Sequence, residues 1–366
     1  MKRRVLITGG AGFIGANLAH HLLEETDAHV HVLDNLSRDG VSSNLESLRD
    51  TIAADPSRLK ITVGDVRDAA LMERAVAAAN EVYHFAAQVA VTTSVLEPRR
   101  DFDVNLGGTF NVLEGARKAG HRPFMLFTST NKVYGDMGGE VIRVGDRHTL
   151  KNEQGISETA RLDFHSPYGC SKGAADQYVR DYARIYGIPT VVFRMSCIAG
   201  LRQMGNEDQG WVAHFVYAAL QGKTLMIYGD GRQVRDVLNV NDLLRAFEAA
   251  RDSQSKTAGQ IYNIGGGPEN TTSLLEQVER VESLTGRKIT VVYDECRPGD
   301  QQIYVTDFSK FTADTGWRPA MGIDETTEQI RAWWLSNRSA LEESMSKLRL
   351  IRAEEALSSI PIARTA

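Results

Sequence analysis

A glycine-rich turn near the start of the chain does most to limit how the chain can fold. The short apolar segment Val5–Ile7 leads into the turn, and an amphipathic stretch, Ala16–Glu24, follows it. Within the turn, Gly9, Gly12 and Gly15 are spaced three residues apart. Glycines at such positions allow a tight turn, close approach of the backbone to a pyrophosphate, and close packing of a helix on a strand. We therefore predict a strand, a dinucleotide-binding turn and a helix, although glycine-rich turns also occur for purely structural reasons.

An acidic residue follows the next predicted strand. His29–Leu33 ends at Asp34, which lies 19 positions after Gly15. A carboxylate at this place can accept both hydroxyls of an adenosine ribose and repels a 2′-phosphate, so we expect NAD rather than NADP. Arg38 is weaker evidence for NADP, because a basic side chain there can contact a 2′-phosphate.

Predicted strands and helices continue to alternate along the chain. This alternation predicts an α/β fold with a Rossmann-type, doubly wound parallel sheet that binds ligands at the carboxyl ends of its strands. We place this domain at residues 1–197, and a smaller, mostly C-terminal α/β substrate domain at 198–336, interleaved with the first near 235–250. A charged tail covers 337–366. Further strands are predicted at Leu59–Val63, Val82–Phe85, Phe124–Thr128, Thr190–Arg194, Ile261–Ile264 and Ile289–Val292.

Tyr168 and Lys172 lie four positions apart within Asp163–Gln177. Pro167 suits the first turn of a helix, so both side chains are predicted to share one helical face. A free phenol has a pKa of about 10, and lowering it to near 7 takes roughly 4 kcal/mol of preferential stabilisation of the phenolate, which nearby cations can supply. The pair is therefore a candidate proton-transfer group, although in isolation an ordinary surface contact is the simpler interpretation.

The residues expected to hold the cofactor lie in the glycine turn, after the acidic strand and at the ends of later strands. Asp65 has two interpretations, a contact to the adenine amine or the cap of a helix over Ala69–Ala79. Ala86 and Ala87 are small, which leaves room for a cofactor over the edge of the sheet. The full set is Gly9, Gly12, Phe13, Ile14, Gly15, Asp34, Asn35, Ser37, Arg38, Asp65, Val66, Ala86, Ala87, Gln88, Asn105, Thr128, Tyr168 and Lys172.

Composition excludes several classes of function. Of the 366 residues 42% are apolar and 24% are charged, and the net charge is −5 without long blocks of one sign, so we expect neither nucleic acid nor a membrane as a partner. Three widely separated cysteines fit neither a disulfide framework nor a zinc site, and they indicate a reducing compartment. No stretch has the apolar length of a signal-peptide core or a membrane span. We expect a cytoplasmic protein that holds no metal.

Three stretches together indicate a known family. Residues Thr128–Gly135 read Thr-Ser-Thr-Asn-Lys-Val-Tyr-Gly at the end of the fifth predicted strand. With the Gly9–Gly15 turn and the Tyr168/Lys172 pair, this stretch resembles the extended short-chain dehydrogenase/reductase family of nucleotide-sugar epimerases and dehydratases, over residues 1 to about 335. The resemblance implies that Thr130 joins Tyr168 and Lys172 as the catalytic set, with Tyr168 as the acid–base group.

The residues after Thr130 separate two reactions within this family. The dehydratases carry an acidic pair there, for the loss of water across C5 and C6 of the sugar, whereas this chain has Asn131–Lys132. Its closest resemblance is to the CDP-paratose (CDP-tyvelose) 2-epimerases, which implies inversion at C2 of a CDP-hexose, of the CDP-paratose or CDP-glucose type, through a 2-keto sugar. A 4-epimerase of a UDP-hexose and a non-catalytic NAD-binding protein are the alternatives. The resemblance is carried by Thr128–Asp136, the insertion that reaches Glu158, Asp163–Gln177 and Asp208–Trp211.

The resemblance also implies how the ligands are held. NAD stays tightly bound and is not consumed, Arg235 and Arg297 contact the phosphates of the nucleotide, and Asp300 takes its ribose hydroxyls. Trp211 is either a core residue or a platform for the base. We expect a homodimer or homotetramer paired through the helices after the fourth and fifth strands. The implied substrate-binding residues are Gln88, Thr130, Asn131, Ser196, Trp211, Arg235, Arg297 and Asp300.

Overall fold

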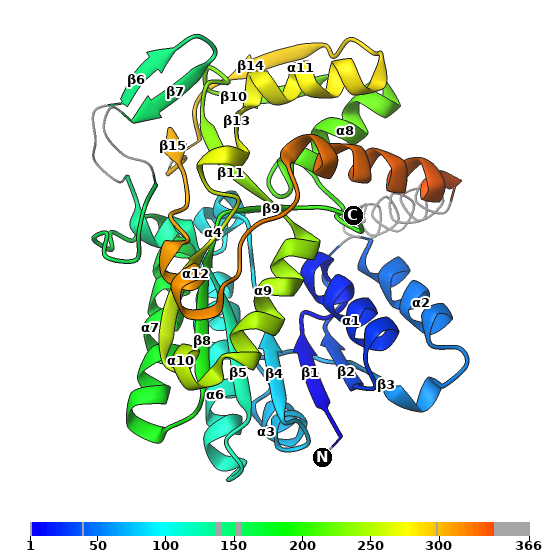
Figure 1. Cartoon of the computed structure of the whole chain (residues 1–366), viewed down its shortest axis with the longest axis vertical. Helices are drawn as coiled ribbons and strands as arrows, with labels where there is room; N and C mark the ends of the chain where they lie inside the picture. Colours follow the sequence, from blue (N-terminus) through cyan, green and yellow to red (C-terminus); the bar gives the residue numbers. More distant parts are fainter. Residues whose placement is uncertain (1, 39, 137–140, 151–154, 298, 340–366) are drawn as a thin grey trace, which may run out of the picture.

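A seven-stranded parallel sheet forms the centre of the computed structural model, which describes residues 2–38, 40–136, 141–150, 155–297 and 299–339 (Figure 1). The predicted doubly wound, Rossmann-type sheet is confirmed, because the strand order reverses direction at the first strand. All neighbouring strands are parallel. In sheet order they are β12 (Gln260–Ile264), β8 (Thr190–Met195), β5 (Phe124–Thr130), β4 (Glu81–His84), β1 (Arg4–Thr8), β2 (His29–Asp34) and β3 (Leu59–Val63).

Helices cover both faces of this sheet, because alternate residues of each strand point to opposite sides. Along β1, Val5 and Ile7 belong to one buried apolar cluster, whereas Leu6 belongs to the other. The first cluster contains side chains of α1 (Phe13–Glu25), α2 (Val41–Thr51), α9 (Val240–Asp252) and α12 (Ser309–Thr315). The second contains side chains of α3 (Ala69–Ala77), α6 (Gly108–Lys118) and α7 (Ser166–Tyr186).

A smaller α/β part lies across the carboxyl ends of the large sheet (Figure 1). Its own apolar cluster is built from α8 (Trp211–Gln221), α11 (Leu274–Thr285) and a last helix over residues 323–339. The predicted strand at Ile289–Val292 lies two residues later. The strands pair as β10 (Leu225–Tyr228) with β14 (Val291–Asp294), and β11 (Val234–Asn239) with β9 (Cys197–Ala199), β13 (Thr271–Ser273) and β15 (Ile303–Tyr304).

The two parts exchange segments of the chain. Near residues 235–250, where the sequence indicated interleaving, β11 belongs to the smaller part and α9 returns to the large sheet, where it packs beside α1. The chain then adds β12, after the short α10 (Gln254–Thr257), as the outer strand next to β8. On the far side of β12, the backbone N–H of Asn263 donates to Glu158 Oε1 at 2.7 Å, so a residue of the insertion covers part of this edge.

The described part of the 137–159 insertion is a β-hairpin followed by a packed segment. The hairpin strands β6 (Val141–Val144) and β7 (Arg147–Leu150) pair antiparallel at the periphery of the smaller part, where β7 contacts β11, β13 and β15 (Figure 1). Ile156 then forms a bridge to Thr306 and packs in a buried cluster with Tyr134. No described residue of the insertion lines the main cavity. Most of the predicted tail at 337–366 lies outside the described residues.

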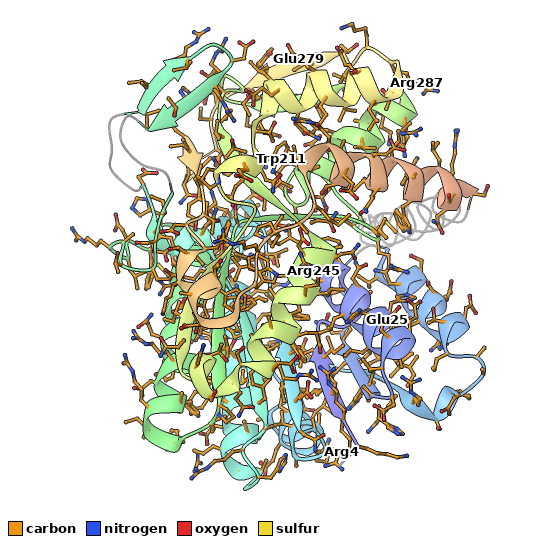
Figure 2. The ribbon with its side chains drawn as sticks, viewed as in Figure 1. Arg4, Glu25, Trp211, Arg245, Glu279 and Arg287 are labelled. Atoms are coloured by element: carbon orange, nitrogen blue, oxygen red, sulfur yellow. The ribbon has the colours of Figure 1, made fainter. Side chains whose placement is uncertain are left out.

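Four of the charged side chains labelled in Figure 2 lie at the periphery of the two parts, whereas Trp211 lies near their junction. The labelled examples at the periphery are Arg4, Glu25, Glu279 and Arg287. Within the described ranges, no helix has both the length and the apolar character needed to cross a membrane.

Candidate active site

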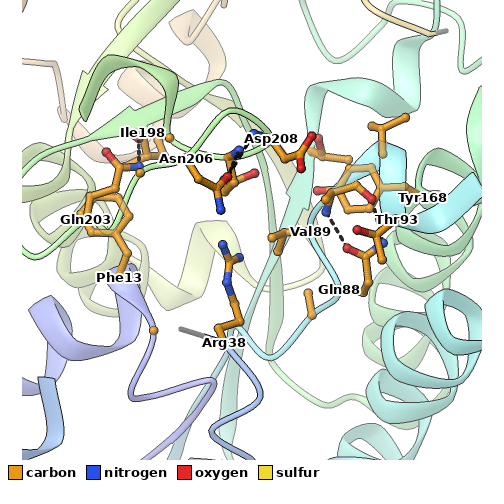
Figure 3. A pocket seen from close by; sticks show the side chains of 18 of the residues that line it. Phe13, Arg38, Gln88, Val89, Thr93, Tyr168, Ile198, Gln203, Asn206 and Asp208 are labelled. Carbon is orange, nitrogen blue, oxygen red and sulfur yellow. Dashed lines mark hydrogen bonds between the residues drawn. The ribbon is translucent and has the colours of Figure 1, made fainter. Parts of the chain in front are cut away.

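A large cavity lies where the carboxyl ends of the sheet meet the smaller part (Figure 3). Its volume is about 1370 Å³, and it extends from the glycine turn past Tyr168 to Arg235 and Arg297. All the predicted site residues line it except Asp65 and Asn105. One continuous space of this size can hold a dinucleotide and a second ligand together.

The glycine turn is packed too tightly for side chains at two of its predicted positions. Gly9 has φ +67°, and a Cβ there would lie 2.6 Å from the backbone nitrogen of Ala86. A Cβ at Gly15 would lie 2.4 Å from the carbonyl oxygen of Gly9. Gly10, which sequence reasoning did not single out, is equally confined, with a backbone oxygen 2.8 Å from its Cβ position. Helix α1 begins directly after Gly12 without a side-chain cap, so its amino end fits a pyrophosphate.

Asp34 ends β2 and is held by backbone amides. Ala11 N–H donates to Oδ2 at 3.1 Å, and Leu36 N–H donates to Oδ1 at 2.9 Å. Burial raises the pKa of Asp34, while these hydrogen bonds and Arg38 act to lower it. Figure 3 shows Arg38 pointing into the cavity toward Asn206. The glycine turn and the fixed carboxylate of Asp34 at the cavity wall therefore fit an adenine dinucleotide.

Asp65 does not reach the cavity. Its carboxylate accepts two hydrogen bonds from the guanidinium of Arg67 and one from Asn35, each at 2.9 Å. These contacts, the bond from Arg67 first, hold its pKa well below the usual range despite partial burial. The cap of α3 is Asp68, whose side chain accepts from Leu71 N–H, so the interpretation of Asp65 as that cap is wrong.

Asn105 lies beneath the cavity rather than on its wall, and it is 1% exposed. Its Oδ1 accepts from Gln88 N–H at 2.8 Å, and its Nδ2 lies 3.1 Å from Ser171 Oγ on α7. Asn105 lies in a π-helical turn (Asp103–Gly107) that joins α5 (Pro98–Phe102) to α6, and the short helix α4 (Val91–Leu96) precedes them. Asn105 therefore positions the Gln88 loop against α7.

Gln88 lines the cavity, but its side-chain amide is used within the protein. Its Nε2 donates to Asp101 Oδ1 at 2.9 Å and to Ala90 O at 2.8 Å, while its Oε1 accepts from Ala90 N–H. The other oxygen of Asp101 accepts from Ser171 Oγ at 2.5 Å. This network fixes the wall beside Tyr168, which Figure 3 shows close to Gln88 and Thr93.

Thr130, Tyr168 and Lys172 converge where β5 ends against the first turns of α7. The hydroxyl of Thr130 and the phenol of Tyr168 both line the cavity here, and Thr130 acts to lower the pKa of that phenol. Lys172 Nζ donates to the carbonyl oxygen of Thr128 at 2.6 Å and lies 4.2 Å from the ring centre of Phe127. The structure thus brings the three predicted catalytic side chains together from two elements.

Burial sets the protonation of this group in the protein alone. It raises the pKa of Tyr168 to about 12, although Thr130 and Arg38 act to lower it. It also lowers the pKa of Lys172 to about 7, against the attraction of Asp101 and Asp176. Without a bound ligand the phenol stays protonated at neutral pH, which is opposite to the lowering expected from the Tyr168/Lys172 pair. A further positive charge near the phenol would favour its phenolate form and so make Tyr168 a better base.

At the other end of the cavity, Arg235 and Asp300 form an ion pair. Arg235 Nη2 donates to Asp300 Oδ1 at 2.8 Å and also to the carbonyl oxygen of Gln301. Lys132 Nζ lies 3.5 Å from the same oxygen of Asp300. Asp300 is thus held between two cations. Sequence reasoning placed Asn131 in the substrate site but missed Lys132, whose position indicated only that a carboxylate of the dehydratases is absent.

Arg297 is held by a loop that crosses the cavity. Its Nη1 donates to the carbonyl oxygen of Glu207 at 2.9 Å and lies 3.1 Å from Asp208 Oδ1. The guanidinium also lies 3.7 Å from the ring centre of Tyr228. The same oxygen of Asp208 accepts a hydrogen bond from Thr92 at 3.0 Å, so Asp208 joins both walls of the cavity.

The remaining predicted substrate residues have structural contacts of their own. Trp211 Nε1 donates to Cys197 Sγ at 3.4 Å, and its indole packs against Phe215 at the edge of the apolar cluster while lining the cavity. Ser196 Oγ donates to Asp236 Oδ1 at 2.5 Å. Asp236 is fully buried and also accepts from Gly267 N–H at 3.0 Å, so it braces the loop that follows β12.

Comparison with known proteins identifies the family. The family described as GDP-mannose 4,6 dehydratase matches residues 6–330. A CDP-paratose 2-epimerase from Salmonella typhi is 38% identical, over 90% of this chain and 98% of its own length.

Two solved structures share the fold. The UDP-glucose 4-epimerase of Thermotoga maritima with UDP-glucose is 30% identical with a TM-score of 0.78, over 91% of this chain and 99% of that chain. The dTDP-glucose 4,6-dehydratase of Streptomyces venezuelae with NAD bound is 30% identical with a TM-score of 0.79, over 92% and 98%. The predicted family is therefore confirmed, and the chain belongs to the GDP-mannose 4,6 dehydratase group of the NAD-dependent epimerase/dehydratase family, the extended short-chain dehydrogenases/reductases.

Proposed function

We propose that the protein is an NAD-dependent epimerase that inverts C2 of a CDP-hexose, of the CDP-paratose or CDP-glucose type. The observation that carries this proposal is one cavity lined by the glycine turn, by Thr130, Tyr168 and Lys172, and by Arg235 and Arg297. The choice of C2 and of a CDP-sugar is supported by the similarity to the Salmonella typhi enzyme.

The chemistry follows from the difficulty of removing a proton from an alcohol carbon, where nothing stabilises the carbanion. When bound, NAD accepts a hydride from that carbon, later returns it, and adds a positive charge near the phenol. Tyr168, which lines the same cavity as Thr130, receives the proton of the C2 hydroxyl as the sugar is oxidised. It gives the proton back to the ketone oxygen when the opposite face is reduced. Both hydride and proton return to the sugar, so only its configuration changes and NAD is not consumed.

The oxidised sugar has to turn over while the nucleotide stays fixed. That requires a strong grip away from the reacting carbon. Arg235 and Arg297 suit this role because a guanidinium can bond two phosphate oxygens at once. In the structure both are already positioned by protein contacts, Arg235 by Asp300 and Arg297 by Asp208.

Relatives that catalyse other reactions define the alternatives. Loss of water across C5 and C6 needs carboxylates after Thr130, and Asn131–Lys132 supplies an amide and an ammonium instead. Inversion at C4 of a UDP-hexose is the second candidate, supported by the similarity to the Thermotoga maritima structure. The same Thr130 and Tyr168 would serve it, because the pose of the sugar decides which hydroxyl they meet.

A homodimer or homotetramer is part of the proposal. Aromatic side chains on α6 and α7 form a connected and partly exposed surface, in which Phe110 is 42% and Tyr178 is 46% exposed with ring centres 6.0 Å apart. Tyr186 extends the surface along α7. A paired copy would remove these rings from water.

The test uses purified protein without added cofactor. CDP-glucose and CDP-paratose, each with deuterium at C2, are followed by NMR beside UDP- and dTDP-hexoses. We expect the C2 epimer to form with deuterium retained at C2. Exchange of the label with solvent would contradict hydride transfer, and inversion of a UDP-hexose at C4 without any C2 inversion would select the second candidate.

A further inference from the structure

Lys132 connects the reacting end of the cavity with its nucleotide end. It lies in the 3-10 turn η3 (Asn131–Tyr134), directly after the strand that ends in Thr130. Its side chain is 20% exposed and lines the cavity. The ammonium is thus placed close along the chain to Thr130 and in direct contact with the Arg235/Asp300 pair.

Lys132 and Arg235 contact one and the same carboxylate oxygen. Arg235 Nη2 is 2.8 Å and Lys132 Nζ is 3.5 Å from Asp300 Oδ1. Because both nitrogens meet a single oxygen atom, they also lie close enough together to bind neighbouring oxygens of one diphosphate. With Lys132 protonated, the single carboxylate balances only one of the two positive charges.

The cluster is fixed by Gln301, which is 2% exposed. Its Nε2 donates to Gly135 O at 2.8 Å, just after the turn that carries Lys132, and its own carbonyl oxygen accepts from Arg235. The spacing between the ammonium and the guanidinium is therefore set by the protein before any ligand arrives.

The electrostatics of the cluster match an anionic group of the substrate. Burial lowers the pKa of Lys132 to about 8, and Arg235 adds to this effect while Asp300 opposes it. Although burial acts to raise it, the two cations lower the pKa of Asp300. A partly buried cluster with excess positive charge is stabilised by a further anion.

The order of groups along the cavity indicates which anion this is. In the proposed function Thr130 meets the reacting sugar oxygen. Lys132 follows two residues later in the chain, and it contacts the same oxygen of Asp300 as Arg235 does. A nucleotide sugar presents its parts in the same order: the reacting sugar, the phosphate linked to it, and the second phosphate.

We propose that Lys132 binds the sugar-linked phosphate of the substrate and so provides the fixed point about which the oxidised sugar turns. The turning rests on the proposed function, whereas the phosphate contact does not. An acidic residue at this position would repel the same phosphate. Lys132 is thus a binding residue that also favours epimerisation geometry over the acid-assisted loss of water.

The test compares binding of CDP and CMP to the holoenzyme by calorimetry. Lys132→Met should weaken CDP binding roughly 10- to 100-fold, the usual effect of losing a charged hydrogen bond, and leave CMP binding within about twofold. Lys132→Arg, which keeps the charge, should retain most of the preference for CDP. Lys288→Met removes a lysine that is 92% exposed and should change neither affinity. UDP and UMP extend the comparison to the second candidate substrate.

The inference is overturned if Lys132→Met binds CDP as tightly as the unaltered protein does, or if it loses CDP and CMP equally. Lys132→Gln carries the same comparison should the Met variant fail to fold. A lost preference for CDP without C2 inversion of any CDP-hexose would keep the phosphate contact and reject the proposed reaction. If the protein inverts C2 of a CDP-hexose but Lys132→Met still prefers CDP to CMP as the unaltered protein does, the proposed reaction stands and the phosphate contact of Lys132 is rejected.

Discussion

The ammonium nitrogen of Lys172 lies 2.6 Å from the carbonyl oxygen of Thr128. This contact joins α7 to the end of β5, so the helix that carries Tyr168 is tied to the strand that carries Thr130. Lys172 is 4% exposed, and its protonation therefore affects the stability of the fold as well as the chemistry.

The first prediction concerns the pH dependence of that stability. The pKa of Lys172 is lowered from 10.5 to about 7 in the folded protein. Between these values the unfolded chain binds a proton that the folded protein releases, so this group makes the fold more stable as pH rises. Lys172→Met removes the effect. The melting temperature of the unaltered protein minus that of Lys172→Met should therefore increase from pH 6 to pH 10. The variant should also lose activity at least about 100-fold. A constant difference across this range would contradict the prediction.

Tyr168→Phe should separate chemistry from binding. Loss of the proton-transfer group should reduce kcat about 10²- to 10⁴-fold, with the Kd for CDP nearly unchanged. Tyr293→Phe is the matched control, since that phenol is 55% exposed and lies outside the cavity lining. Single-turnover kinetics and calorimetry measure the two quantities. If Tyr168→Phe weakened binding and left the chemical step intact, the assigned role would fail.

Gly15→Ala should damage the cofactor site through overpacking. The new methyl group would lie 2.4 Å from the carbonyl oxygen of Gly9, so the helix has to move away from the strand. We expect about 1–3 kcal/mol of lost stability, and loss of NAD during purification. Gly322→Ala is the control, because no atom lies within 4 Å of that Cβ position. Unfolding in denaturant measures the stability, and the absorbance of released cofactor measures the bound NAD. A Gly15→Ala protein that keeps its NAD would contradict the assignment of the Gly9–Gly15 turn as the cofactor site.

Phe110→Glu should change the oligomeric state. A charge in the aromatic surface on α6 and α7 would have to be buried in any pair formed there, which is costly without a partner. Light scattering coupled to size-exclusion chromatography should show a smaller particle. Val292→Glu, on a 43% exposed strand residue of the smaller part, should leave the particle unchanged. An assembly of unaltered size in Phe110→Glu would place the interface elsewhere.

Local patterns were sufficient to predict the large sheet. A short apolar run predicts each of the strands β1 to β5. The glycine spacing and Asp34 predict where the cofactor binds, because these residues lie close together in the chain. The cluster of Lys132, Arg235 and Asp300 could not be predicted in this way. Its members come from three separate loops and strands, and they meet only because the smaller part folds back over the sheet.

Burial accounts for the other differences between the predicted site and the site in the structure. Asn105 and Gln88 are polar residues beside the cavity, as expected, but the need to satisfy buried amides directs their side chains into the protein. The pKa of Tyr168 moves upward because removal from water outweighs the neighbouring charges. Neither effect is visible in the spacing of residues.

The position of β12 has a consequence for how the protein is made. Synthesis releases the chain from its amino end, so six strands of the large sheet can pair before the seventh exists. Until residues 260–264 emerge, β8 has one unpaired edge, while β9, β10, β11 and α9 are still being added. An open edge of a buried parallel sheet invites pairing with other chains. The nascent chain is therefore most open to aggregation in this interval, and a fragment that stops at residue 197 would stay in that state permanently.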